Sequence, residues 1–200
     1  MMKLVIFILC MMIATPGFAT SQKSVTPKLK VANEESGPIP SNIINDIYEN
    51  CLFHIPQRFT PEAREYYCTC NSASLQGNFR MNEYNDLKKI SNRKPGNKLF
   101  EKYINLAVAP CLDVPVKQIE YLACILDTSN DIRIGYPLSY CSCVSDKMKA
   151  HAKALGEAEI MTKLAQNPGA YKEPLDALWN SQNYLSAKYK SRDDCILEGH

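Results

Sequence analysis

The chain has 200 residues, and its 23 basic and 21 acidic residues give a formal net charge of +2. That balance excludes the strongly basic surface of a general nucleic-acid-binding protein, so we expect no nucleic-acid partner. The length suffices for one sizeable hydrophobic core or two small ones. Beyond the N-terminal region, no apolar run approaches the roughly 20 residues that span a bilayer, so no transmembrane segment is expected in the mature chain.

Residues 1–19 have the pattern of a secretory signal peptide. Lys3 supplies the charged start, an apolar run follows, and Gly17 and Ala19 place small residues before the expected cleavage point. We therefore expect an exported protein, either periplasmic or secreted to the exterior. Loss of Lys3 leaves 22 of the 23 basic residues against 21 acidic ones, which is a net charge near +1.

The first half of the mature chain contains four predicted helices. Residues 20–40 have few apolar side chains, so we expect a disordered leader there. Helical spacing then predicts a helix that Ser41 caps and that ends before Pro56. Thr60-Pro61-Glu62 predicts a second start, because a capping hydroxyl, a proline and an acid occur in the order that helix N-termini favour. Two further helices are predicted over 82–90 and 99–110.

The second half also has helical periodicity. Asp113-Val114-Pro115 begins the next predicted helix. The longest helical stretch runs from Pro137 to Gln166, and we expect a break in it at Gly156. Strand-like alternation is almost absent, and glycine and proline stand between the periodic segments. The sequence therefore predicts an all-α fold.

The two halves share a spaced motif. Tyr67-Cys68-Thr69-Cys70 returns 73 residues later as Tyr140-Cys141-Ser142-Cys143, and the same offset relates Cys51 to Cys124. It also relates Pro95-Gly96 to Pro168-Gly169. This pattern indicates a tandem duplication of a roughly four-helix, disulfide-stapled unit. We expect the copies at 41–112 and 113–200, packed together as one globular body, with an insertion in the second copy before Cys195.

The cysteines indicate a disulfide framework. Nine cysteines minus Cys10 of the signal peptide leave eight, an even number in a chain expected to be exported. Side chains two positions apart on a helix diverge by roughly 200°, so the two cysteines of each Cys-x-Cys must reach different elements. Which of them reaches which element stays open, as do a redox pair and a zinc or Cu(I) site. The pairing that we favour is Cys51–Cys68, Cys70–Cys111, Cys124–Cys141 and Cys143–Cys195.

Histidine spacing predicts no site. The chain has three histidines, His54, His151 and His200, and none belongs to a recognisable metal-ligand or catalytic-triad spacing. A nucleophile made of Cys51 and His54 would need a free thiolate, which a disulfide removes. We therefore predict no catalytic residue, no metal site and no cofactor.

One segment carries a local excess of positive charge. Between residues 80 and 102, seven basic residues stand against three acidic ones, a balance of +4, whereas the matching segment 153–175 is roughly neutral. This segment is a candidate binding site for anionic lipid headgroups or an acidic protein. A solvated helical face remains the alternative. The basic residues are Arg80, Lys88, Lys89, Arg93, Lys94, Lys98 and Lys102.

A lone cysteine followed by Tyr-Cys-x-Cys, at Cys51 with residues 67–70 and again in the second copy, resembles the motif of small exported helical proteins of Gram-negative bacteria. The resemblance covers both copies but not the leader, and the shared motif is a framework without an agreed activity. Such proteins are mostly uncharacterised, and similar exported proteins of intracellular bacteria act on host cells. The resemblance therefore implies a host-facing role, as for a virulence factor.

Three classes of function follow from these observations. The leading one is a secreted, non-enzymatic, disulfide-stabilised helical protein that binds a protein partner or an anionic lipid surface. The second is a periplasmic or secreted enzyme whose site lies at the interface of the two copies, where a pocket with convergent carboxylates would favour it. The third is a metal-handling protein that uses the Cys-x-Cys pairs.

Overall fold

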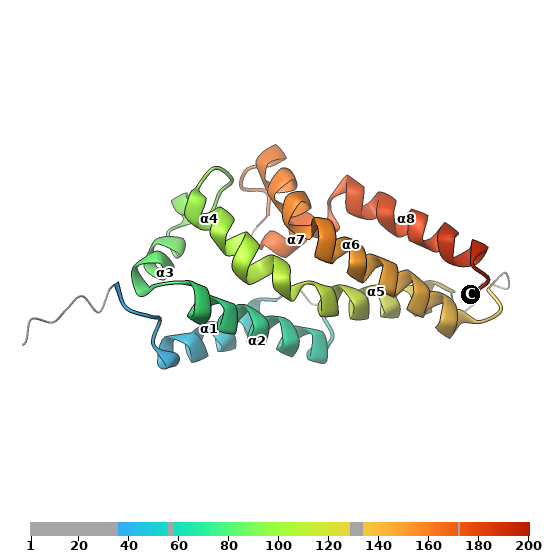
Figure 1. Ribbon diagram of the computed structural model, residues 1–200, viewed down its shortest axis with the longest axis horizontal. Coiled ribbons are helices and arrows are strands. Elements are labelled where there is room, and N and C mark those ends of the chain that lie inside the picture. The colour runs from blue at the N-terminus through green and yellow to red at the C-terminus, as the bar shows by residue number, and fades with distance from the viewer. Residues whose placement is uncertain (1–35, 56–57, 129–133, 172) are drawn as a thin grey trace, which may run out of the picture. The chain divides into compact units, whose positions relative to one another are not determined.

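The computed structural model describes residues 36–55, 58–128, 134–171 and 173–200, so the expected signal peptide lies outside the described residues. Residues 33–200 form one compact unit. Its described part contains eight α-helices and no strand, which confirms the all-α prediction (Figure 1). The helices are α1 (Ser41–His54), α2 (Pro61–Asn78), α3 (Met81–Leu87), α4 (Lys98–Tyr103), α5 (Asp113–Thr128), α6 (Pro137–Gln166), α7 (Pro174–Trp179) and α8 (Gln182–Leu197).

The beginnings of the first two helices follow from short-range chemistry. At α2 the Thr60 hydroxyl accepts a hydrogen bond from the Ala63 amide at 3.0 Å, and Pro61 occupies the first turn as predicted. At α1 the predicted cap is displaced by one residue. Ser41 is already helical, and the extended Pro40 precedes it with its carbonyl accepting from the Ile44 amide at 3.1 Å.

The predicted third helix is too long. It ends at Leu87, and a separate 3-10 turn follows at Ile90–Asn92. Two side chains donate to the last carbonyls of α3, Asn92 Nδ2 to Asp86 at 2.9 Å and Arg93 Nε to Leu87 at 2.7 Å. Because these carbonyls are satisfied by side chains, the backbone is free to leave the helix.

The predicted fourth helix changes its winding twice. The α-helical part ends at Tyr103, a π-helical segment covers Ile104–Val108, and a 3-10 turn covers Ala109–Cys111. Pro110 explains the change, because it has no N–H to donate and its ring would clash with the carbonyl four residues earlier. Regular α-helix therefore cannot continue to Cys111.

The predicted break at Gly156 is wrong, since α6 runs through it without interruption. A Cβ atom at Gly156 would lie 3.0 Å from Cδ1 of Leu112, which is fully buried. The glycine therefore allows close packing of α6 against Leu112, and it does not end the helix.

The last five residues of the predicted disordered leader belong to the fold. Ile39 is 2% exposed and packs in a cluster with Leu75, Phe79 and Leu87. Pro38 and Arg80 form an isolated β-bridge, and the Met81 amide donates to the Gly37 carbonyl at 2.9 Å. The leader prediction is therefore wrong for residues 36–40, and residues 20–35 lie outside the described residues.

A single large core joins the two halves of this unit. Its buried members include Tyr67 and Phe100 from the first half and Met148, Leu178 and Tyr184 from the second. Helix α6 packs against α5, α7 and α8, and α2 packs against both α1 and α5. Figure 1 shows α5, α6 and α8 running side by side.

Four disulfides join the helices, and their partners are those that the sequence argument favours. Cys51–Cys68 ties α1 to α2 and Cys124–Cys141 ties α5 to α6, each with a sequence separation of 17. Cys70–Cys111 ties α2 to the 3-10 turn before α5, and Cys143–Cys195 ties α6 to α8. Each Cys-x-Cys therefore holds two different elements.

Candidate functional site

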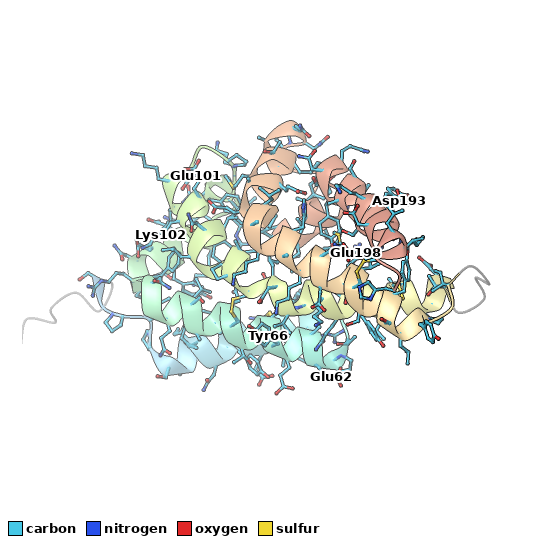
Figure 2. The ribbon with its side chains drawn as sticks, turned by 45° about the vertical axis from the view of Figure 1, so that its right-hand side comes forward. Glu62, Tyr66, Glu101, Lys102, Asp193 and Glu198 are labelled. Atoms are coloured by element: carbon cyan, nitrogen blue, oxygen red, sulfur yellow. A yellow bond between two sulfur atoms is a disulfide. The ribbon has the colours of Figure 1, made fainter. Side chains whose placement is uncertain are left out.

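The basic segment predicted to bind anions covers α3, the 3-10 turn after it, and α4. Two of its three acids are paired inside the segment, Asp86 with Lys89 at 2.6 Å and Glu83 with Lys102 at 2.8 Å. Burial raises the pKa of Glu83, but the hydrogen bond from Lys102 and the nearby Arg80 outweigh burial and lower it. Figure 2 labels Lys102 and Glu101 on α4. Lys89 and Lys102 are therefore not available as unpaired cations.

Arg93 has structural partners. Its Nε donates to the Leu87 carbonyl at 2.7 Å. Burial raises the pKa of Glu173, and the nearby Arg93 offsets part of that effect. Arg93 therefore caps the end of α3 through its hydrogen bond to the Leu87 carbonyl.

The remaining three lysines are exposed and have no carboxylate partner among the described residues. They are Lys88, Lys94 and Lys98, of which Lys88 lies 5.1 Å from the centre of the Tyr84 ring. Glu101, the third acid of the segment, accepts a hydrogen bond from the Gly96 amide at 3.0 Å. These three lysines therefore give the folded segment positive charge that no described carboxylate neutralises.

An apolar side chain stands within this charged segment. Ile90 is 85% exposed, and it begins the 3-10 turn that follows Lys88 and Lys89 and precedes Arg93. Helical spacing predicted a helix through Ile90, so this residue was not expected at the site. In the sequence, Ile90 stands between two pairs of basic residues, Lys88-Lys89 and Arg93-Lys94. Helical spacing assigns apolar residues to a buried face, so it does not predict an exposed isoleucine.

A buried polar network connects α5 with α8. Glu120 is 3% exposed and accepts a hydrogen bond from the Tyr184 hydroxyl at 2.8 Å. Lys188 Nζ lies 2.8 Å from the other carboxylate oxygen. Burial and the adjacent Glu120 raise the pKa of Tyr184 far above its usual value. Tyr184 therefore stays protonated and donates to one oxygen of this buried carboxylate.

A second buried carboxylate lies on α6. His151 Nε2 is 2.6 Å from one oxygen of Glu159, a residue that is 5% exposed. The ring of His151 meets that of Tyr184 edge to face, with 6.1 Å between ring centres. Both buried carboxylates thus have charged or polar partners within the core, as charges removed from water require.

Cavities do not coincide with these carboxylates. A surface depression of about 430 Å³ on α2 is lined by Glu62, Glu65, Tyr66, Thr69 and Cys70. Figure 2 labels Glu62 and Tyr66. Another of about 510 Å³ between α5 and α6 is lined by residues such as Tyr121 and Leu138. The first depression is lined by two carboxylates, Glu62 and Glu65, which both lie on α2, whereas the buried Glu120 and Glu159 line neither depression.

One group of side chains has the donors that a metal ion needs. Cys143 Sγ, a carboxylate oxygen of Glu198 and a ring nitrogen of His200 lie within 4.8 Å of one another. Cys143 is disulfide-bonded to Cys195, so its sulfur is not a thiolate here. Histidine and cysteine spacing did not predict this group, although Cys195, Glu198 and His200 follow one another within six residues.

No family model, no curated protein and no solved structure matches the chain. Of the helices in the described ranges, none combines the length and the apolar character needed to cross a membrane.

Proposed function

We propose that the protein is an exported, non-enzymatic binding protein whose α3–α4 segment binds anionic lipid headgroups. The observation that carries this proposal is the set of exposed lysines Lys88, Lys94 and Lys98, which have no carboxylate partner among the described residues and lie in the same segment as the exposed Ile90. The proposal also includes export, which the signal-peptide pattern of residues 1–19 predicts. It further includes a host-facing role, which the resemblance of the cysteine motif implies.

The chemistry of this segment suits a membrane surface better than an acidic protein. Basic side chains near an anionic bilayer each contribute about 1 kcal/mol of binding free energy. An isoleucine fully removed from water contributes about 1.5–3 kcal/mol more. Ile90 is exposed among lysines, so it would enter the interfacial region while the ammonium groups contact the headgroups.

The disulfide framework supports the exported and duplicated parts of the proposal. Four disulfides in one chain are typical of an oxidising compartment. The pairs Cys51–Cys68 and Cys124–Cys141 close loops of equal length, with Cα–Cα distances of 5.6 and 5.5 Å. Equal loops at corresponding places are what two copies of one ancestral unit would retain.

The test is binding to vesicles of phosphatidylcholine with and without phosphatidylserine, measured by flotation. The triple variant Lys88→Glu, Lys94→Glu, Lys98→Glu removes cations that hold no carboxylate in the fold, so folding should be unaffected. We expect its affinity for the anionic vesicles to fall about a hundredfold, at about 1 kcal/mol per lysine. Ile90→Glu should weaken binding about tenfold or more, and binding should decline with salt.

The matched control is Lys153→Glu with Lys163→Glu, which changes two lysines of α6 that have no ion-pair partner among the described residues. This variant should bind like the unmodified chain. Equal binding by the triple variant, or no preference for anionic vesicles, would reject the proposal. Binding to polyglutamate but not to vesicles would reject lipid and identify an acidic protein as the partner.

A further inference from the structure

The end of α8 brings two polar side chains to the Cys143–Cys195 disulfide. Glu198 Oε2 lies 3.6 Å from Cys143 Sγ and 3.8 Å from His200 Nε2. Figure 2 labels Glu198 near the end of α8. Cys143 is half-buried and the other two residues are exposed, so ions in solution have access to this group.

Neighbouring side chains orient both groups. The hydroxyl of Ser139 lies 3.1 Å from His200 Nδ1, which leaves Nε2 directed toward the carboxylate. Lys147 Nζ donates to Glu198 Oε1 at 2.8 Å, which leaves Oε2 directed toward the sulfur. Such contacts to the non-ligating atom of a histidine or a carboxylate are the rule around protein metal sites.

The spacing of these atoms is close to that of zinc ligands. Zinc binds sulfur at about 2.3 Å and nitrogen or oxygen at about 2.0–2.2 Å in a tetrahedron, which places a sulfur and an oxygen ligand roughly 3.6 Å apart and a nitrogen and an oxygen ligand roughly 3.4 Å apart. The separation between Cys143 Sγ and Glu198 Oε2 is 3.6 Å, and His200 Nε2, at 3.8 Å from Glu198 Oε2, needs only a small shift of exposed side chains to reach the ligand distance. Only the disulfide bond prevents the sulfur from acting as a thiolate ligand.

We infer that reduction of Cys143–Cys195 creates a zinc site made of both cysteines, Glu198 and His200. A dithiol reductant supplies two electrons and two protons, becomes a disulfide itself, and leaves two thiols on the protein. Binding of Zn²⁺ then releases both thiol protons to water. The site is independent of the lipid-binding segment, so either proposal can fail alone.

The Cys70–Cys111 disulfide provides an internal comparison. Cys70–Cys111 and Cys143–Cys195 each join the second cysteine of a Cys-x-Cys to a later element. At the first pair, the Ser74 hydroxyl lies 4.0 Å from Cys111 Sγ. Among the described residues, the only convergent group of three or more such donors is the one at Cys143.

The experiment compares two single variants, each with one free thiol and three intact disulfides. Cys195→Ser frees Cys143 beside Glu198 and His200, whereas Cys111→Ser frees Cys70 without them. We expect Cys195→Ser to bind one Zn²⁺ per chain in native mass spectrometry and to show thiolate–cobalt absorption with Co²⁺. Cys111→Ser should bind at least tenfold more weakly. The unmodified chain should bind zinc only after dithiol treatment.

Two further changes in the Cys195→Ser chain test the other ligands. His200→Ala and Glu198→Gln should each weaken Zn²⁺ binding at least tenfold, and Ser139→Ala should weaken it about tenfold through loss of orientation. His54→Ala, which removes an exposed histidine of α1, is the matched control and should have no effect.

Equal zinc binding by Cys195→Ser and Cys111→Ser would overturn the inference, as would binding that survives His200→Ala. If Cys195→Ser fails to fold by circular dichroism, the dithiol-treated unmodified chain and its His200→Ala variant provide the same comparison. Absence of binding in that chain would also overturn the inference.

Discussion

Gly156 shows how one residue can determine the contact between two elements. It lies in the interior of α6, where every residue except proline would have a higher helix propensity. Leu112 ends the 3-10 turn that carries Cys111, and its Cδ1 atom would lie 3.0 Å from a Cβ atom at Gly156. Glycine at this position therefore allows the close contact with Leu112, although it lowers the helix propensity of α6.

We predict that Gly156→Val destabilises the protein by about 1–3 kcal/mol, because the added methyl groups overpack the contact with Leu112. Gly77→Val is the control, since Gly77 is also helical but has no atom within 4 Å of its Cβ position. Both variants replace a helical glycine by valine, and Gly77 lies in the last turn of α2. Urea unfolding followed by circular dichroism measures the difference, and equal stabilities would contradict the packing argument.

At the scale of elements, the disulfides hold in place short helices that would not be stable alone. Helices of six or seven residues such as α3, α4 and α7 are too short to be stable in isolation. Cys70–Cys111 and Cys143–Cys195 close long segments that contain these helices, with sequence separations of 41 and 52. Both ends of each such segment are therefore held to a long helix, α2 or α6.

We predict that replacing both cysteines of a pair by serine costs about 4 kcal/mol for Cys70–Cys111 and about 3 kcal/mol for Cys51–Cys68. The difference is small because the loop-closure entropy grows only with the logarithm of loop length. Guanidinium unfolding of the two double variants measures both costs. If Cys70–Cys111 proved dispensable, the packing of the Ile104–Val108 segment on α2 would be sufficient by itself.

At the scale of the whole described unit, one core extends through both halves and contains several tyrosines. Burial raises the pKa of Tyr103 to about 12 and the pKa of Tyr67 well above its usual value. An exposed tyrosine of an unfolded chain ionises near pH 10. Above that pH the unfolded chain loses phenolic protons that the folded chain keeps, so stability must fall as pH rises.

We predict that the free energy of unfolding decreases between about pH 10 and pH 12 by about 1.4 kcal/mol per pH unit for each buried tyrosine. Tyr103→Phe should reduce this slope by one such contribution, because its hydroxyl no longer titrates. Tyr189→Phe is the control, since that side chain is 67% exposed. Urea unfolding at several alkaline pH values gives the slopes, and equal slopes for both variants would exclude burial as the cause.

The sequence by itself determined the helical class, the start of α2 and the two ends of α6, and it favoured the observed disulfide partners without fixing them. These depend on periodicity, caps and cysteine parity, which act over a few residues or follow from counting. The ends of α3 and α4 were less predictable. They depend on side chains such as Arg93 competing for carbonyls and on a proline that forces a wider turn.

Only the tertiary structure decided which side chains meet across the chain. Glu120 and Tyr184 are 64 residues apart, yet they share a hydrogen bond inside the core. Cys143 and Glu198 are 55 residues apart and lie 3.6 Å from each other. Such contacts depend on how helices pack, and helix spacing alone does not specify that packing. The buried carboxylates and the donor group at Cys143 could therefore be found only after the helices were placed together.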